Sequence, residues 1–550
     1  MPNLTVILED IELSSLRESG GAVQNIVEST LIAPAPPSPI QYPRGVKLAF
    51  ITVGLVLSIF LAALDSTIIA TAIPSITDQF GSIANIAWYG SAYSITNTAF
   101  QSSWGKAYGY FDLKRVFLLA IFVFEAGNVI CTSAQSSEAL ILGRVVAGIG
   151  GGGLMTGAFI IIALTVKPQY RAAYMGVLGV TFGCASVVGP LMGGALTDGP
   201  GWRWCFWVSL PIGFLATVTM VFFFTSPIPP KEATLKEKVV CMDLNGGVLV
   251  TGALSCFVLA MHWAGIRSWN SPAIILSLAG FGTLSIVFLL NERFMGPKAM
   301  IQSHLLRSRR VLTNLIYIFC LAGVFFPLLY SLPIQFQSIN NNSASQSGVR
   351  LIPLVLGVSA FTMVANALLT YWRHYNPFLV IGAIAATIGV SMIYTLDMQT
   401  SSRVWIGYEL LTAMGVGLAL QIPMIANQAA VSTEDMASAT SLSLFMENVG
   451  TSLFVAGSEA AFTNGLLHSL IKKAPTLDAN EVLGAGVTQI RSSFTQNEVK
   501  IILASYLDGC RVSHVVSVAC GAAACLVAIV GVAPTASQEL KRRRKKPHEP

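Results

Sequence analysis

Residues 179–198 read "GVTFGCASVVGPLMGGALTD", a stretch apolar enough to cross a bilayer that nevertheless holds five glycines and a proline. About twenty apolar residues span the hydrocarbon core of a membrane. In lipid, helices associate by close backbone approach through small residues, because burying apolar side chains gains little there. Small residues recur every four positions in this stretch: Ala185, Gly189, Gly193 and Thr197. The pattern predicts a spanning helix with one flat side for a second helix, and Pro190 predicts a bend.

The composition of the whole chain indicates a membrane protein. Apolar residues make up 53% of the 550 residues and charged residues 11%, whereas about 25% charged residues are typical of soluble domains. The nine cysteines are scattered and form no CxxC pair, so no metal site is expected. The net charge of +6 does not indicate a nucleic-acid partner.

Apolar blocks of spanning length follow one another along the chain. They predict fourteen transmembrane helices, of which the second and the thirteenth are the most polar. The expected spans are 47–73, 86–107, 115–134, 139–165, 172–197, 203–224, 244–263, 272–291, 311–336, 347–371, 378–396, 404–430, 437–464 and 513–533.

An even number of spans places both termini on the same side of the membrane. With that side taken as the cytoplasm, the inner segments hold 23 of the 33 Lys and Arg residues. Short cytoplasmic loops carry such an excess, so both termini are expected in the cytoplasm. The proline-rich arm before residue 45 is expected to be disordered, and the tail "KRRRKK" (541–546) to be a cytoplasmic charge anchor.

Two charged residues fall inside expected spans, Asp65 in the first and Arg144 in the fourth. Charges at membrane depth cost several kcal/mol and usually serve function. Their depths allow an ion pair in which Asp65 exchanges a proton during transport, with Arg144 stabilising its ionised form. The alternative is a structural pair that only fixes helix packing.

Several motifs resemble one family. The segment "VVGPLMGG" (187–194) is similar to the span 5 motif of antiporters in the major facilitator superfamily. The segments "LDSTIIATAIPSI" (64–76) and "LILGRVVAGIGGGG" (140–153) resemble the span 1 and span 4 motifs of its fourteen-span drug:proton antiporters. Two further stretches, 201–213 and 332–354, look like fungal members of that group. One motif departs, because the loop "GKAYGYFDLKR" (105–115) has Asp112 where the family pattern has glycine.

The resemblance implies an all-α polytopic membrane protein with the major facilitator fold, built as two six-helix bundles and two linking helices. It implies that Gly189, Pro190, Gly193 and Gly194 pack against the counterpart helix of the other half and seal an outer gate. It also implies that export is the mode of transport. Glu447 lies in span 13 where relatives often carry Gln, and it is a candidate to join Asp65 and Arg144 in proton coupling. The alternative is that Glu447 is a neutral, hydrogen-bonded substitute for Gln.

Uncharged polar residues within spans are candidates for the wall of a substrate cavity, although about half of them could merely bridge helices. They are Tyr93, Asn97, Gln421, Asn427 and Gln428. Asn341 begins an N-x-S sequon in an expected outer loop, which makes it a candidate for glycosylation. There is no nucleotide-binding GK[ST] loop, and neither enzyme activity nor a cofactor is expected.

Together these patterns predict a proton-coupled exporter of small amphipathic organic molecules, such as a drug, toxin or secondary metabolite. The expected partners are the substrate, protons and the lipid bilayer, without nucleic acid, and the protein is expected to be a plasma-membrane monomer. Uptake of a small solute such as an iron chelate or an amino acid is one alternative, and a membrane sensor that transports nothing is another. The expected regions are an arm (1–45), a first bundle (46–225), a linker (226–310), a second bundle (311–534, with an outer loop at 465–512) and a basic tail (535–550).

Overall fold

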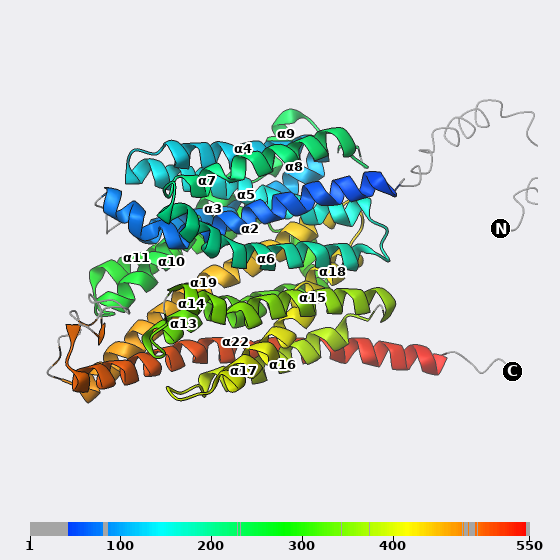
Figure 1. Cartoon of the computed structure of the whole chain (residues 1–550). Coiled ribbons are helices and arrows are strands. Elements are labelled where there is room, and N and C mark those ends of the chain that lie inside the picture. The colour runs from blue at the N-terminus through cyan, green and yellow to red at the C-terminus, as the bar shows by residue number, and fades with distance from the viewer. Residues whose placement is uncertain are drawn as a thin grey trace, which may run out of the picture. The chain divides into compact units, whose positions relative to one another are not determined.

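The computed structural model describes residues 42–545 apart from 81–85, 228, 231–232, 343, 373 and most of 476–492. The chain divides into Met1–Tyr42 and a compact unit, Pro43–Pro550, and every described helix belongs to the second unit (Figure 1). The disordered arm expected before residue 45 therefore lies almost wholly outside the described residues.

Six helical segments form the first half. Side chains fix some of their beginnings: the Asp112 carboxylate accepts from the Arg115 N–H at the start of one helix, and Ser136 accepts from Ala139 at the start of the next. The segments are α2 (Val46–Phe80), α3 (Ile86–Tyr110), α4 (Leu113–Ser133), α5 (Ser137–Thr165), α6 (Arg171–Asp198) and the pair α7 (Trp204–Trp207) and α8 (Ser209–Phe223). Helix α2 packs on α6, and α5 packs on both α3 and α4.

The second half repeats this packing order. Its helices are α13 (Arg309–Ser338), α14 (Ala344–Arg350), α15 (Ile352–Trp372), α16 (Asn376–Tyr394), α17 (Ser402–Ala419), α18 (Ile422–Ala430), α19 (Met436–Lys473) and α22 (Gln496–Lys545). Helix α13 packs on α19, and α17 packs on both α15 and α16. First-on-fifth, second-on-fourth and third-on-fourth contacts thus occur in both halves.

The segment between the halves forms a hairpin of two long helices with short helices beside it. Its elements are α9 (Leu235–Cys241), α10 (Leu244–Ile266), α11 (Pro272–Met295), η2 (Gly296–Lys298) and α12 (Ser303–Arg307). Asp243, in the left-handed backbone region, begins α10 and accepts hydrogen bonds from Gly246, from Asn291 and from the Met300 N–H. The base of the hairpin is thereby closed. Helix α10 packs on α3 of the first half and on α19 of the second.

Twelve helices of the described chain are long and apolar enough to cross a membrane. Helices α3 and α19, over the second and thirteenth expected spans, are not among them, so the expected number of fourteen is not confirmed. Both helices are long but face one another with polar side chains such as Gln101 and Asn448, which lowers their hydropathy.

The expected outer loop at 465–512 is shorter than the sequence predicted. Helix α19 continues to Lys473 and α22 already begins at Gln496, and α22 runs on to Lys545 into the expected tail. Apolar residues cause the first two extensions, because Leu466 and Leu470 of α19 pack with Ile502 and Tyr506 of α22 in one buried cluster. The connection carried too few long apolar runs for this packing to be recognised from sequence.

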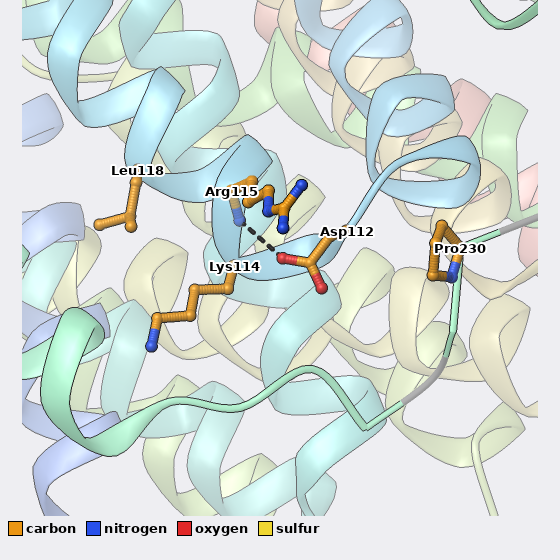
Figure 2. A pocket seen from close by; sticks show the side chains of 5 residues that line it. All are labelled: Asp112, Lys114, Arg115, Leu118 and Pro230. Atoms are coloured by element: carbon orange, nitrogen blue, oxygen red, sulfur yellow. Dashed lines mark hydrogen bonds between the residues drawn. The ribbon is translucent and has the colours of Figure 1, made fainter. Parts of the chain in front are cut away.

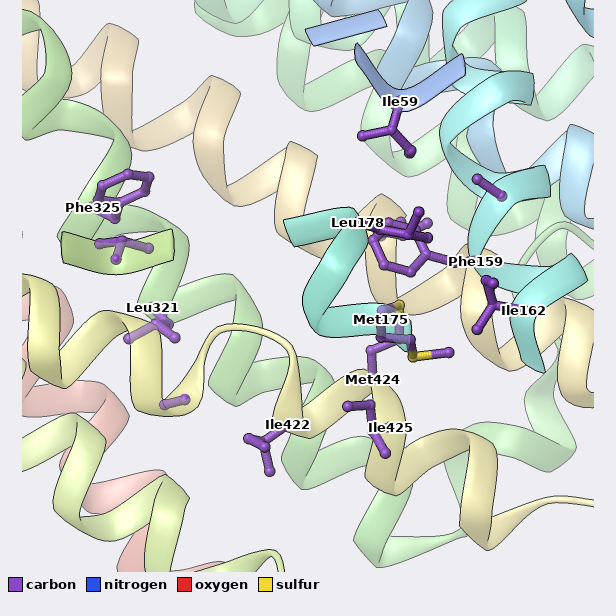
Figure 3. Close-up of a cluster of buried hydrophobic side chains, with 14 of the residues drawn as sticks. Ile59, Phe159, Ile162, Met175, Leu178, Leu321, Phe325, Ile422, Met424 and Ile425 are labelled. Carbon is purple, nitrogen blue, oxygen red and sulfur yellow. The ribbon is translucent and has the colours of Figure 1, made fainter. Parts of the chain in front are cut away.

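One apolar cluster joins the two halves (Figure 3). Phe159, Met175 and Leu178 from the first half belong to it together with Met424 and Ile425 from the second. Around this cluster, the first residues of α6 and α19 meet the last residues of α15 and α3. We call this end of the unit the contact end.

Candidate functional site

A buried ion pair connects the first, second and fourth helices of the first half. Arg144 Nη1 of α5 lies 2.6 Å from Asp65 Oδ2 of α2, and the side chains of both residues are almost completely buried. Arg144 Nε donates to the Tyr89 carbonyl of α3 at 3.0 Å, and Nη2 donates to the Asp65 carbonyl at 3.3 Å. A buried charge pair is tolerated when further hydrogen bonds satisfy it, and this one is so satisfied. The structure joins the two residues, while their part in proton coupling stays a prediction.

Aromatic rings surround the guanidinium group. Its central carbon lies 4.5 Å from the ring centre of Tyr93 and 5.8 Å from that of Phe206. The Tyr93 hydroxyl donates to the Ala62 carbonyl at 3.1 Å, which fixes the ring against α2. Tyr93, expected in a substrate cavity, is therefore part of the wall of the ion pair. Asn97, one turn further along α3, lies with Tyr93 against Gly151 of α5.

The polar residues of the second half bridge helices. The Asn314 amide donates to Asn427 Oδ1 at 2.8 Å, and Asn427 Nδ2 donates to Ser443 at 3.0 Å, so this side chain ties α18 to α13 and α19. Gln428 Nε2 donates to Thr440 at 2.9 Å. These contacts match the alternative that polar residues of this group bridge helices. Their lining of a cavity remains a prediction.

Gln421 lies where α17 ends and α18 begins, between Ala419 and Ile422. It accepts from the Asn366 amide of α15 at 2.8 Å, and its own amide nitrogen lies against Gly179 of α6. This cavity candidate thus lies at the boundary between the halves. The sequence gives no distinctive signal for Asn366, because it is one more amide in an apolar helix.

Glu447 of α19 is half buried, and its carboxyl forms no ion pair or side-chain hydrogen bond with the described residues. Within the described part of the chain, no contact joins it to Asp65 or Arg144. Its neighbour Asn448 donates to Gln101 Oε1 of α3 at 2.7 Å, which links the two halves. The carboxyl therefore lies next to a residue that bridges the halves.

The glycines of α6 divide between two partners. A side chain at Gly189 would meet Thr67 and Ile68 of α2, and one at Gly193 would meet Ile68 and Thr71. In this structure these two glycines therefore pack on α2 rather than on the other half, and their sealing of an outer gate stays a prediction. The cause is the register of α6, which turns these glycines towards the helix that carries Asp65. A side chain at Gly194 would meet no neighbouring atom within 4 Å of its Cβ. Pro190 lies inside α6 without ending the helix.

The first part of α6 makes the contact with the other half that was expected of the second part. Gly176, Gly179 and Gly183 face Asn366, Thr362 and Ser359 of α15. The spacing of Gly179 and Gly183 is that of a small-residue packing motif, so this contact had a signal in the sequence.

The displaced acid of the loop after α3 has a local role. Asp112 caps α4, with its Oδ1 at 3.0 Å from the Arg115 N–H. Together with Lys114, Leu118 and Pro230 these residues line a surface pocket of about 510 Å³ (Figure 2). Asn341, the glycosylation candidate, is exposed between α13 and α14 and has a positive φ of 54°. Within the described chain, no group of three or more His, Cys, Asp or Glu residues could hold a metal ion.

Comparison with known proteins assigns this arrangement to a family. Residues 55–455 match the model of the Major Facilitator Superfamily. The chain is 39% identical over 521 residues to the MFS-type transporter grgE of a Penicillium species, covering 94% of this chain and 92% of the relative. It is 39% identical over 478 residues to the MFS-type efflux pump MFS1 of Trichophyton rubrum, with 86% and 88% covered.

Solved structures show the same fold at low sequence identity. A bacterial homologue of the human lysosomal transporter Spinster, in an inward-facing conformation, has a TM-score of 0.55 and 16% identity, and 89% of this chain and 98% of that chain are covered. The proton:xylose symporter XylE has a TM-score of 0.53 and 13% identity, with 86% and 94% covered. The helix order and the packing described above are those of this fold.

Proposed function

This chain belongs to the major facilitator superfamily, and on that premise we propose that it exports small amphipathic organic molecules in exchange for protons. It is a multi-pass membrane protein and a secondary transporter. The observation that carries proton coupling is the buried Asp65–Arg144 pair, a single acid and a single base held between α2 and α5. Relatives named as efflux pumps support the direction of transport.

In this proposal Asp65 is the group that takes up and releases a proton. When protonated, its carboxyl no longer attracts Arg144 by charge, and α2 is free to move against α5. When the proton leaves, the Asp65 carboxylate forms its ion pair with the Arg144 guanidinium again, and this pair holds α2 and α5 together. Because Gly189 and Gly193 pack against α2 directly beyond Asp65, such a movement would reach α6. Pro190 and Gly194 belong to the same segment of that helix.

Orientation and location are part of the same proposal. Both termini would lie in the cytoplasm of a plasma-membrane monomer, as the distribution of Lys and Arg predicts. The contact end, which holds the first residues of α6, would then face the cytoplasm. Tyr93, Asn97, Gln421, Asn427 and Gln428 remain candidates for the cavity wall, and Glu447 for a second coupling carboxyl beside Asn448.

The decisive test is Asp65→Asn in sealed vesicles that carry a pH gradient and are loaded with a fluorescent amphipathic dye. The amide cannot exchange a proton, so dye export driven by the gradient should fall to background while dye binding remains. Asp397→Asn is the control, because Asp397 is exposed between α16 and α17, and it should export normally. Undiminished gradient-driven export in Asp65→Asn would exclude this carboxyl from the mechanism.

A deletion strain tests the direction. Cells without the protein should accumulate the substrate and become more sensitive to it. A strain that instead fails to take up a nutrient would show that the protein is an importer.

A further inference from the structure

The fourth helices of the two halves, α5 and α17, correspond residue by residue. Gly150 of α5 lies against the backbone of Phe124 in the third helix, and Gly415 of α17 lies against the backbone of Ala386 in the corresponding helix α16. Two residues later, Gly152 faces the Asn97 carbonyl of α3, and Gly417 faces the Val358 carbonyl of α15. Two independent close contacts therefore align α5 with α17, with Gly150 equivalent to Gly415 and Gly152 equivalent to Gly417.

This register places Glu409 at the position of Arg144. Each is the eighth residue of its helix and stands six residues before the first glycine of the pair. Counted back from the same contacts, Arg350, which ends α14 two residues before α15 begins, stands at the position of Tyr89, since they precede Val358 and Asn97 by eight residues. In the first half these two positions touch, through the hydrogen bond from Arg144 to the Tyr89 carbonyl. The second half thus carries an acid on its fourth helix and a base at the end of α14, just before its second helix α15.

Glu409 is completely buried, and neither of its carboxyl oxygens has a hydrogen-bond partner. An isolated buried carboxylate would cost several kcal/mol, whereas a neutral carboxylic acid would cost much less. Arg350 lies 5.5 Å from the ring centre of Trp405, one turn before Glu409 on α17, and 5.4 Å from that of Phe336 on α13. The base is therefore held by rings beside the acid but not in ion-pair contact with it.

Arg350 is the charged group whose electrostatic attraction would stabilise an ionised Glu409 carboxylate. Helices α15 and α16, which pack on α17, contain no charged residue, and α13 carries only Arg309 and Arg310 in its first two positions. On α17 itself the other charge is Arg403, in the first turn. The backbone N–H of Leu354, at the start of α15, lies near the carboxyl without making a hydrogen bond of acceptable geometry.

We infer that Glu409 and Arg350 form a second proton-exchange site, in which the acid stands at the repeat position of Arg144 and the base at the repeat position of Tyr89. In the state described here Glu409 holds the proton. On release the O–H bond breaks, the electron pair stays on the carboxylate, and the proton passes to water. Arg350 remains cationic and moves from the rings to the carboxylate. The inference deepens the proposed function, on which its part in transport rests.

Infrared difference spectroscopy of the purified full-length protein measures this proton without any substrate. In the wild type, raising the pH should convert a carboxylic-acid C=O band of a buried group into carboxylate bands. Glu409→Gln should lose this band. Glu125→Gln is the matched control, because the Glu125 oxygens are also buried without hydrogen bonds but belong to α4, and it should keep the Glu409 band.

The arginine is tested in the same experiment. Without its charge the carboxylate is less stabilised, so in Arg350→Gln the band should persist to a pH about 1 unit higher or more. A Glu409→Gln spectrum identical to that of the wild type at every pH, or an unshifted titration in Arg350→Gln, would overturn the inference. A titrating Glu409 in a protein that does not export dye would instead contradict the proposed function alone.

Discussion

At the scale of single residues, the Arg144 guanidinium donates hydrogen bonds to three acceptors and also makes cation–π contacts with two aromatic rings. A lysine could not do so, because its ammonium group is a point charge without the planar fork of donors. The pair is therefore held by its surroundings as much as by its two charges. Its stability should respond to changes in residues that carry no charge.

Tyr93 provides such a test through two variants. Tyr93→Phe removes the hydrogen bond to Ala62 but keeps the ring, so the free energy of unfolding should fall by about 1 kcal/mol. Tyr93→Leu also removes the ring from the guanidinium and should cost a further ~1–2 kcal/mol. Thermal unfolding of purified protein in detergent compares them. Tyr108→Phe is the control, because Tyr108 makes a similar bond to the Gly153 carbonyl and its ring makes no cation–π contact with an arginine of the described chain. If Tyr93→Leu unfolds like Tyr93→Phe, the ring does not stabilise Arg144.

The sequence identified Asp65 and Arg144 because charged residues in apolar helices are rare and stand out. It could not identify Gln101 with Asn448, or Asn366 with Gln421. Amides occur on many faces of these helices, and which of them meet depends on how the helices are rotated and shifted. The relation between Glu409 and Arg144 also required the glycine contacts of both helices.

At the scale of the helix, α6 shows that one run of glycines can serve two contacts. Its first part lies on α15 and its second part on α2. The sequence predicted a flat helix correctly, but the direction of each glycine depends on a rotation of 100° per residue and on the neighbours available. Similarly, the expected span at 404–430 is divided into α17 and α18 at Leu420 and Gln421, because Pro423 cannot donate its backbone hydrogen bond.

Gly189→Leu should damage transport more than Gly194→Leu, although the two residues belong to one motif. A side chain at Gly189 would meet Thr67 and Ile68, whereas Gly194 has open space around it. Overpacking of this kind costs about 1–3 kcal/mol, so Gly189→Leu should reach the membrane in reduced amounts and lose most of its dye export. Pro190→Ala, which keeps the surface small, should lose less. Surface labelling and vesicle export measure both effects. Equal export by the two leucine variants would show that α2 tolerates separation from α6.

At the scale of the whole unit, the recorded glycine contacts between the halves gather at the contact end. Gly105 of α3 lies against Ser441 and Ala437 of α19, as Gly176 and Gly183 of α6 lie against α15. Second and fifth helices thus meet in both combinations, as the internal repeat requires. Alternating access would need these contacts to separate.

A covalent link across this contact should stop transport. In the double variant Gln101→Cys with Asn448→Cys, which replaces two side chains that meet at 2.7 Å between α3 and α19, a short bifunctional thiol reagent with a cleavable disulfide should reduce dye export to background, and a reductant should restore it. Each single variant, treated in the same way, controls for the nine native cysteines. Normal export by the fully cross-linked protein would mean that the two helices do not separate during transport.

Protease-sensitive tags test the orientation. A tag after residue 550 should be protected in intact cells, and a tag in the connection between α19 and α22 should be cut. The positive-inside distribution of Lys and Arg is the physical reason. Cleavage of the C-terminal tag in intact cells would show that the orientation is inverted or that the number of spans is odd.

The hairpin of α10 and α11 bears on whether an even or an odd number of membrane crossings can be added between the two halves. It leaves the first half and returns to the second on the same side, since Asp243 at its beginning binds Asn291 and Met300 at its end. Two crossings added together leave the second half in its original sense, so that Glu409 keeps the place in the repeat that corresponds to Arg144. A single added crossing would turn that half upside down and place its charges at the opposite face. Additions at this junction are therefore compatible with the repeat only in even numbers.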